Sequence, residues 1–188
     1  KIYQLLFINW LYSGSLEAVH FYRAVRDEAL ARRGLVPAER HRILSLFVAP
    51  NYGWKLLDWL ERERGARIVA DPYHCHWGEW THDPTHPLSS LARKMLATPA
   101  CKQLHGPAEE FIQDCLEDAR DFRARAAIYW AHLGCRQACG AIRRVKDALR
   151  EKGIPTLVLD CDITDPSVVS VDDIKEKLDA FFEVLEEG

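Results

Sequence analysis

A cysteine at position 135 has the sequence context of a reactive thiol. It stands three residues beyond the expected end of a buried strand at 126–131, after Gly134 and before Arg136. A partly exposed thiol beside a cation ionises more readily than a buried one, and a thiolate serves as a nucleophile or as a soft metal ligand. The alternative interpretation is a small residue that occupies a loop. Cys139, four residues on, either binds the same metal or packs against the strand.

The other four cysteines have weaker contexts. Cys101 and Cys115 fall in helical regions, Cys161 directly follows the expected strand at 156–160, and Cys75 lies in a long loop. The chain has no C-x-x-C pair, so a zinc ribbon or a thioredoxin-type site has no local support. Disulfide frameworks belong mainly to short secreted chains. We therefore expect reduced thiols in the cytoplasm, most of them buried and inert.

The segment Asp71–Pro87 is rich in side chains that bind metals. It contains the run Tyr73–Trp80 and, beyond it, His82 and His86. Two histidines four apart can bind a metal from one face of a helix, but Pro84 lies between them, so we expect no regular helix there. The alternatives are a dedicated metal site and a mobile or substrate-facing loop with half-buried aromatic residues. We favour the second, because loops of this length are usually functional or disordered.

Three aspartates gather after the last expected strand, at Asp160, Asp162 and Asp165. Three carboxylates can hold a cation, but aspartate also accepts hydrogen bonds from nearby amides in turns and helix caps, and we favour that role. The sequence has no G-x-G-x-x-G, P-loop or G-x-S-x-G motif. Conventional dinucleotide, ATP and serine-hydrolase sites therefore have no support.

Strands and helices alternate along the part of the chain that positions these residues. Short apolar runs typical of strands buried on both faces alternate with segments of helical periodicity. This pattern predicts an α/β fold: a flavodoxin-like open, mostly parallel sheet with helices on both faces over residues 41–188, preceded by a helical segment at 1–40. The expected strands are 43–49, 67–70, 126–131 and 156–160, and the expected helices are 15–33, 54–65, 88–96, 107–123, 140–152 and one from about 170.

The predicted sheet determines where a ligand would bind. In open α/β sheets, ligands bind outside the carboxyl ends of the strands. That rule selects four segments: 50–53, 71–80, 132–139 and 160–165.

The composition is that of an ordinary soluble globular protein. With 188 residues, 48% hydrophobic and 28% charged, the chain fits one domain with an appended segment and is neither disordered nor collagen-like. A net charge of −3 with both signs interspersed gives no basic face for nucleic acid. No apolar run reaches the ~18 residues of a membrane span. Because the chain begins at Lys1, we expect it to be part of a longer protein whose amino-terminal domain is missing.

Several segments, in order and spacing, resemble the carboxyl-terminal part of 2-hydroxyacyl-CoA dehydratase and benzoyl-CoA reductase subunits. The resemblance covers nearly the whole chain and is strongest from about 126 to 186. The eighteen-residue interval from Cys135 to Gly153 also agrees with that family. The segments are His132–Arg136, Gly153–Asp162 with Asp165, Ala180–Leu185, and Arg42–Asp71, which ends in the E-x-G-A-x-I/V-V-x-D pattern.

The resemblance implies a specific chemistry. Subunits of this family have two flavodoxin-like domains and a helical part, and they hold a 4Fe-4S cluster through three cysteines. Two of these come from the amino-terminal domain, and the third matches Cys135. The cluster passes one electron to a CoA thioester, so that a ketyl radical forms and a hydroxyl leaves, or an aromatic ring is reduced. An ATP-hydrolysing iron–sulfur activator supplies the electron, and two related subunits form a heterodimer in the cytoplasm.

The same resemblance and the strand-end rule together assign a substrate pocket for an acyl-CoA or aromatic-CoA thioester. We expect Asn51, Asp71, Trp80 and His132 to wall it. The sequence departs from the family at Val171–Lys177, where the family often has a Gln and a Thr-Arg pair, and double-cubane-cluster reductases share the architecture. The alternatives from other classes are a non-catalytic scaffold or electron-relay subunit, and a flavin or small-ligand module.

Overall fold

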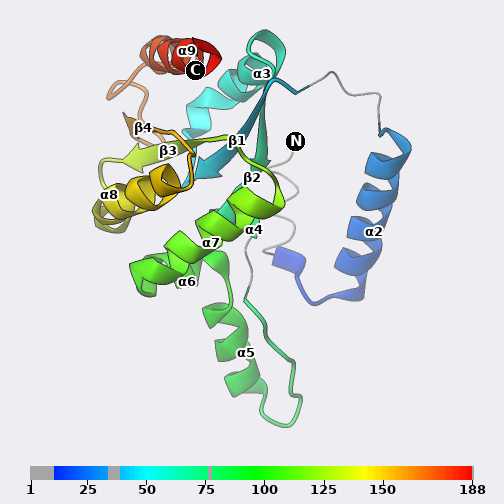
Figure 1. The fold of residues 1–188 in the computed structure, drawn as a ribbon. Coiled ribbons are helices and arrows are strands. Elements are labelled where there is room, and N and C mark those ends of the chain that lie inside the picture. Colours follow the sequence, from blue (N-terminus) through cyan, green and yellow to red (C-terminus); the bar gives the residue numbers. More distant parts are fainter. Residues whose placement is uncertain (1–10, 34–38, 76–77, 188) are drawn as a thin grey trace. The chain divides into compact units, whose positions relative to one another are not determined.

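The four expected strands form one parallel sheet in the computed structural model, which describes residues 11–33, 39–75 and 78–187 (Figure 1). The chain divides into two units, residues 1–38 and 39–188, and the sheet belongs to the second. Its strands are β1 (His41–Leu46), β2 (Ala66–Ala70), β3 (Ala126–His132) and β4 (Thr156–Cys161). The predicted flavodoxin-like α/β fold is confirmed.

The helices of the second unit connect these strands. The described helices are η1 (Asn51–Gly53, one turn of 3-10 helix), α3 (Trp54–Glu63), α4 (Pro72–Cys75), α5 (Pro87–Leu96), α6 (Pro99–His105), α7 (Ala108–Asp121), α8 (Arg136–Glu151) and α9 (Val171–Glu187).

The strand order β2-β1-β3-β4 places β1 and β3 in the centre of the sheet. Ile43 of β1 pairs with Ile68 of β2 and with Ala126 of β3, and His132 at the end of β3 pairs with Cys161 at the end of β4. Because each pair of neighbouring strands is parallel, the carboxyl ends of the four strands lie at one edge of the sheet, as predicted from the sequence.

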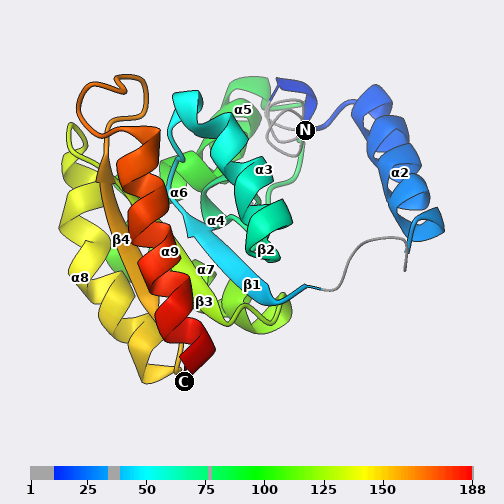
Figure 2. The ribbon, with the colours of Figure 1, turned by 90° about the horizontal axis from the view of Figure 1, so that it is seen from above.

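Two apolar cores lie on the two faces of the sheet. The helices α7 and α8 cover one face, and α3 and α9 cover the other (Figure 2). Residues of β3 alternate between the cores: Tyr129 faces the first and Trp130 the second, and both are fully buried. This double coverage explains why the strands read as continuous apolar runs.

Three details differ from the sequence predictions. The helix α6 has no counterpart among the expected helix ranges, although Cys101 within it was placed in a helical region. It begins at the capping residue Thr98, whose Oγ1 accepts a hydrogen bond from the backbone N–H of Cys101 (3.3 Å). The helix α8 begins at Arg136 and not near residue 140, and the short helix α4 lies within the expected loop.

The first unit contains the helix α2 (Leu16–Ala31). Its N-cap is Ser15, whose Oγ accepts a hydrogen bond from the backbone N–H of Ala18 (3.1 Å). The helix expected at 15–33 is therefore confirmed, while its expected stop at Gly34 lies outside the described residues. No helix in the described ranges is long and apolar enough to cross a lipid bilayer.

A buried hydrogen bond between neighbouring strands gives the first prediction. The indole N–H of Trp130 donates to Ser45 Oγ (3.1 Å), and both residues are fully buried. Replacing Ser45 with alanine leaves that N–H without its acceptor, and we expect the free energy of unfolding to fall by about 1–3 kcal/mol in urea denaturation. Ser89→Ala, at an exposed position of α5, is the control and should change it by less than about 0.5 kcal/mol. Equal effects of the two substitutions would contradict the prediction.

Candidate functional site

The loops that follow the strands meet at the carboxyl edge of the sheet. The backbone N–H of Asn51, after β1, donates to the carbonyl of Ile163, after β4 (2.7 Å). The backbone N–H of Leu133, after β3, donates to the carbonyl of Cys161 (3.1 Å). These bonds bring the predicted residues Asn51 and His132 to the same edge.

Cys135 caps the amino terminus of α8. Its backbone N–H donates to the carbonyl of His132 (2.9 Å), and its Sγ accepts a hydrogen bond from the backbone N–H of Ala138 (3.5 Å). The residue is half-buried and packs with Tyr73 and Ile163 against the core under α7 and α8. The N–H groups in the first turn of a helix favour a negatively charged partner. The structure thus places this soft ligand at the N-cap of α8, facing the N–H groups of the first turn.

Only two of the six cysteines are buried, Cys115 and Cys161, so the prediction that most of them fill the core is wrong. Burial raises the pKa of Cys115 and, with the nearby carboxylates of Asp162 and Asp160, raises the pKa of Cys161 to about 11. Desolvation of the sulfur also raises the pKa of Cys75 to about 12, although the residue is partly exposed. These three thiols are poor sources of thiolate at neutral pH.

Cys139 lies on the first turn of α8 and is exposed. Its Sγ–H donates to the carbonyl of His132 (3.4 Å), which is also the acceptor for the Cys135 backbone. Cys139 is therefore a solvent-accessible thiol four residues from Cys135, and it serves as the comparison for Cys135.

His132 lies at the end of β3 with its ring over the following loop. Its Nδ1 is 3.6 Å from Asp162 Oδ2, beyond hydrogen-bond distance. A Cβ on Gly134 would lie 3.1 Å from His132 Nε2, so the missing side chain at 134 leaves room for the imidazole.

Two of the three aspartates at the end of β4, Asp162 and Asp165, form turns, as the sequence analysis favoured, whereas Asp160 lies within β4. Asp162 Oδ1 accepts hydrogen bonds from the backbone N–H groups of Thr164 (2.8 Å) and Asp165 (2.9 Å). Asp165 Oδ1 accepts from the N–H of Ser167 (2.9 Å). The backbone bonds lower the pKa of Asp162, and the bond from Ser167 Oγ (2.7 Å), followed by the Ser167 N–H bond, lowers the pKa of Asp165.

Asp71 reaches the predicted edge, but the residue is only 4% exposed. Its Oδ2 lies 2.8 Å from His74 Nδ1, and His74 is buried too. Its Oδ1 makes no hydrogen bond within the described residues. Burial raises the pKa of Asp71, and the hydrogen bond from His74 opposes that rise. The carboxylate of Asp71 does not face solvent, so the Asp71–His74 pair supports the strand-end edge from within the protein.

Tyr73 links this buried pair to Cys135 and packs against Phe47; the sequence reasoning selected the segment 71–80 that contains Tyr73 but did not name Tyr73 as a site residue, and it did not assign Phe47 to the site. The ring of Tyr73 packs against His74 (centroids 5.0 Å apart) and against Phe47 (5.2 Å). Burial, followed by the negative charge of a Cys135 thiolate, raises the pKa of Tyr73. Phe47 has a left-handed backbone (φ 67°) directly after β1, which is strained for a bulky residue. Phe47 lay inside the strand expected at 43–49, whereas β1 ends at Leu46, so the sequence carried no signal for this position.

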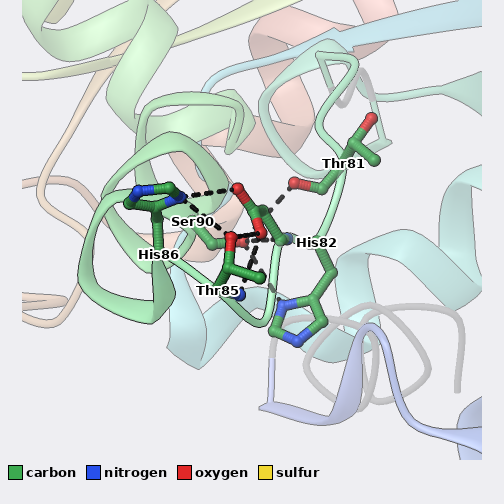
Figure 3. A network of polar contacts seen from close by, with 6 residues as sticks. Thr81, His82, Thr85, His86 and Ser90 are labelled. Atoms are coloured by element: carbon green, nitrogen blue, oxygen red, sulfur yellow. Dashed lines mark hydrogen bonds and ion pairs between the residues drawn. The ribbon is translucent and has the colours of Figure 1, made fainter.

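Trp80 and the two loop histidines lie along α5. The Trp80 ring faces Lys94 Nζ, 5.3 Å from the ring centroid. Figure 1 shows α5 and the segment before it extending away from the sheet. His82 Nδ1 lies 3.3 Å from Ser90 Oγ, and His86 Nδ1 lies 3.0 Å from Asp83 Oδ2 (Figure 3). The place of Trp80 in a pocket wall stays a prediction.

The expectation of no regular helix across His82–His86 is confirmed, because α5 begins at Pro87. Asp83 instead forms a turn, accepting from the backbone N–H of Thr85 (2.9 Å) and donating its own N–H to Ser90 Oγ (2.9 Å). His76 and Trp77, in the middle of the predicted loop, lie outside the described residues. Across the described ranges, no three His, Cys, Asp or Glu side chains are grouped to hold a metal ion.

Comparison with known proteins gives one family. The family model described as 2-hydroxyglutaryl-CoA dehydratase, D-component, matches residues 1–185. No curated protein shows a significant match to the chain.

Proposed function

Since the chain belongs to the 2-hydroxyglutaryl-CoA dehydratase D-component family, we propose that it is the iron–sulfur subunit of an ATP-activated 2-hydroxyacyl-CoA dehydratase or benzoyl-CoA reductase. Family membership makes it a component of a dehydratase-type complex. The cluster, the activation by ATP and the choice between dehydration and ring reduction are the content of the proposal.

The observation that carries the proposal is the position of Cys135. It is a half-buried thiol at the carboxyl edge of a parallel sheet, and its Sγ accepts from the first turn of α8. Thiolates are the usual ligands of iron–sulfur clusters, so the donor chemistry fits one iron of a 4Fe-4S cluster. The described residues offer no group of three ligands, so the proposal takes the other cluster ligands from outside them.

The cluster, when bound, supplies one electron to a CoA thioester, which allows the hydroxyl to leave or an aromatic ring to be reduced. The chain itself supplies the surroundings. Asn51 and His132 lie at the same edge of the sheet as Cys135 and would contact the thioester, and His132 Nδ1 lies 3.6 Å from Asp162 Oδ2. Asp71 and His74 are buried, and the pair positions the ring of Tyr73, which packs against His74.

The proposal includes three partners: a related second subunit, an ATP-hydrolysing iron–sulfur activator, and an acyl-CoA or aromatic-CoA substrate. It also places the protein in the cytoplasm, where thiols remain reduced. The free thiols of the described structure are compatible with that compartment.

The test is anaerobic purification of the protein together with its partner subunit, followed by iron, sulfide and absorbance measurements. We expect about four irons per subunit and broad absorbance near ~400 nm, as for a cubane cluster bound by thiolates. A colourless, iron-free preparation would overturn the iron–sulfur assignment, and the chain would then share only its fold with the iron–sulfur subunits.

The substrate is tested next by titrating the purified complex with 2-hydroxyacyl-CoA and with aromatic-CoA thioesters. Binding and turnover of the hydroxyacyl thioester would support the dehydratase, and reduction of the aromatic thioester would support the reductase. Iron without thioester binding to this chain would favour the alternative of an electron-relay or scaffold subunit.

A further inference from the structure

A large cavity lies at the opposite edge of the sheet from Cys135. It has a volume of about 760 Å³ and lies where α7 and α8 end, next to the segments that lead into β3 and β4. This volume is within the ~300–1,000 Å³ range of small-molecule sites. Its lining residues are Gln113, Leu116, Glu117, Ala119, Arg120, Arg123, Ala124, Arg125, Lys152, Gly153 and Ile154.

The lining is strongly cationic. It holds Arg120, Arg123, Arg125 and Lys152 against one acidic residue, Glu117, although the whole chain has a net charge of −3. Arg120 pairs with Asp121 (2.8 Å). Within the described part of the chain, no ion pair joins the other three cations to an acid.

The helix ends do not account for these charges. Cations often lie at helix carboxyl termini to satisfy exposed carbonyl groups. Here the carbonyl of Phe122, just after α7, accepts from the Arg42 guanidinium (2.7 and 2.9 Å). The carbonyl of Leu149, near the end of α8, accepts from the backbone N–H groups of Lys152 (3.0 Å) and Ile154 (2.9 Å). The three cations are therefore available to an anion from solution.

The floor of the cavity is apolar, formed by the buried residues Ala119, Ala124 and Ile154 together with half-buried Leu116. An apolar floor with a cationic rim fits a ligand that has a flat ring and a strongly anionic end. We propose that this cavity binds a nucleoside diphosphate, with the base on the apolar floor and the phosphates between Arg123, Arg125 and Lys152. The proposal is independent of the function proposed for the Cys135 edge.

A substitution at Arg123 can separate loss of ligand binding from loss of stability. Its backbone is left-handed (φ 50°) just beyond the end of α7, a position where glycine is favoured. Arg123→Gly removes a cation from the cavity and also relieves the backbone strain. It should therefore weaken binding while raising the melting temperature by ~2–4 °C. A loss of binding caused by unfolding would move the melting temperature in the other direction.

The experiment is isothermal titration calorimetry of the full chain at low salt with ADP, inorganic pyrophosphate and adenosine. We expect ADP to bind, pyrophosphate to bind more weakly and adenosine not to bind. Arg123→Gly and Lys152→Ala should each weaken ADP binding ~10-fold, the effect of losing a charged hydrogen bond. The matched control is Arg143→Ala, an exposed arginine of α8 that is paired with Asp147 and lies outside the cavity lining, and it should leave the affinity unchanged.

Two results would overturn the proposal. The first is equal ADP affinity in wild type, Arg123→Gly and Lys152→Ala. The second is the absence of ADP binding. If a polyglutamate peptide binds in place of ADP, the cavity is part of a surface that binds an acidic protein, and the nucleotide proposal is also overturned. Binding of CoA as tight as that of ADP would support the site and identify the nucleotide end of a coenzyme as its source.

Discussion

Replacing Cys135 with serine is expected to remove most of the iron from the anaerobically purified complex while the fold stays intact. The Cys135 Sγ caps α8 by accepting from the Ala138 N–H, and serine is an even better residue at that position. The substitution thus removes the soft ligand but keeps the helix cap. Iron should fall from about four per subunit to fewer than about one, and the melting temperature should change by less than ~2 °C.

Cys139→Ser is the matched control for this experiment. Cys139 is an exposed thiol one helical turn beyond Cys135 in α8, and its Sγ–H donates to the carbonyl of His132. We expect it to retain full iron and unchanged absorbance. Loss of iron in Cys139→Ser together with full iron in Cys135→Ser would move the ligand by one helical turn and leave the proposed function standing. Full iron in both variants would contradict any role of this edge in holding a cluster.

Sequence reasoning predicted the sheet because the sheet depends on a pattern that each segment carries by itself. The runs at Ile43–Leu46 and Ala126–Ala131 are almost entirely apolar, with Ser45 as the polar exception in the first, because helices bury both faces of the sheet. A parallel sheet then brings all strand ends to one edge. The neighbourhood of Asn51, His132 and Cys135 was predictable for that reason.

Other features depend on contacts between distant segments and were not predictable in this way. The helix α8 covers Tyr129 and draws Cys135 into its cap, so Cys135 and Cys139 lie one turn apart and not in a loop. The burial of Asp71 results from α4, which the sequence presented as part of a long polar loop. The cationic cavity combines residues from the ends of two helices, and no local pattern marks it.

Two Asp–His pairs of the chain have the same sequence spacing, but one is buried and the other is exposed. Comparing them shows how burial changes the contribution of such a pair to the free energy of unfolding. Asp71 and His74 are three residues apart with side chains 5% and 7% exposed. Asp83 and His86 have the same spacing and the same atoms in contact, with side chains 42% and 73% exposed. Breaking a buried pair leaves a charge that the interior cannot solvate, whereas an exposed pair contributes little.

We therefore expect His74→Ala to lower the free energy of unfolding at pH 7 by about 3–5 kcal/mol, and His86→Ala by less than about 1 kcal/mol. Urea denaturation followed by circular dichroism measures both. If His74→Ala fails to fold, the double variant Asp71→Asn/His74→Ala keeps the prediction testable, because a neutral amide at position 71 removes the uncompensated charge. The double variant should then be more stable than the single variant.

The cost of His74→Ala should also depend on pH in a defined direction. Burial raises the pKa of Asp71 above its ordinary value, and His74 opposes that rise. A carboxyl group with a raised pKa in the folded state stabilises the fold at low pH and loses that contribution as the pH increases through the raised value. Without His74 the pKa of Asp71 rises further, so the variant should lie closest to wild type near pH ~4.5 and fall away toward pH 7. The double variant has no ionisable side chain at position 71 and should lack this trend. A penalty that is independent of pH in the single variant would show that Asp71 is not the group whose charge His74 compensates.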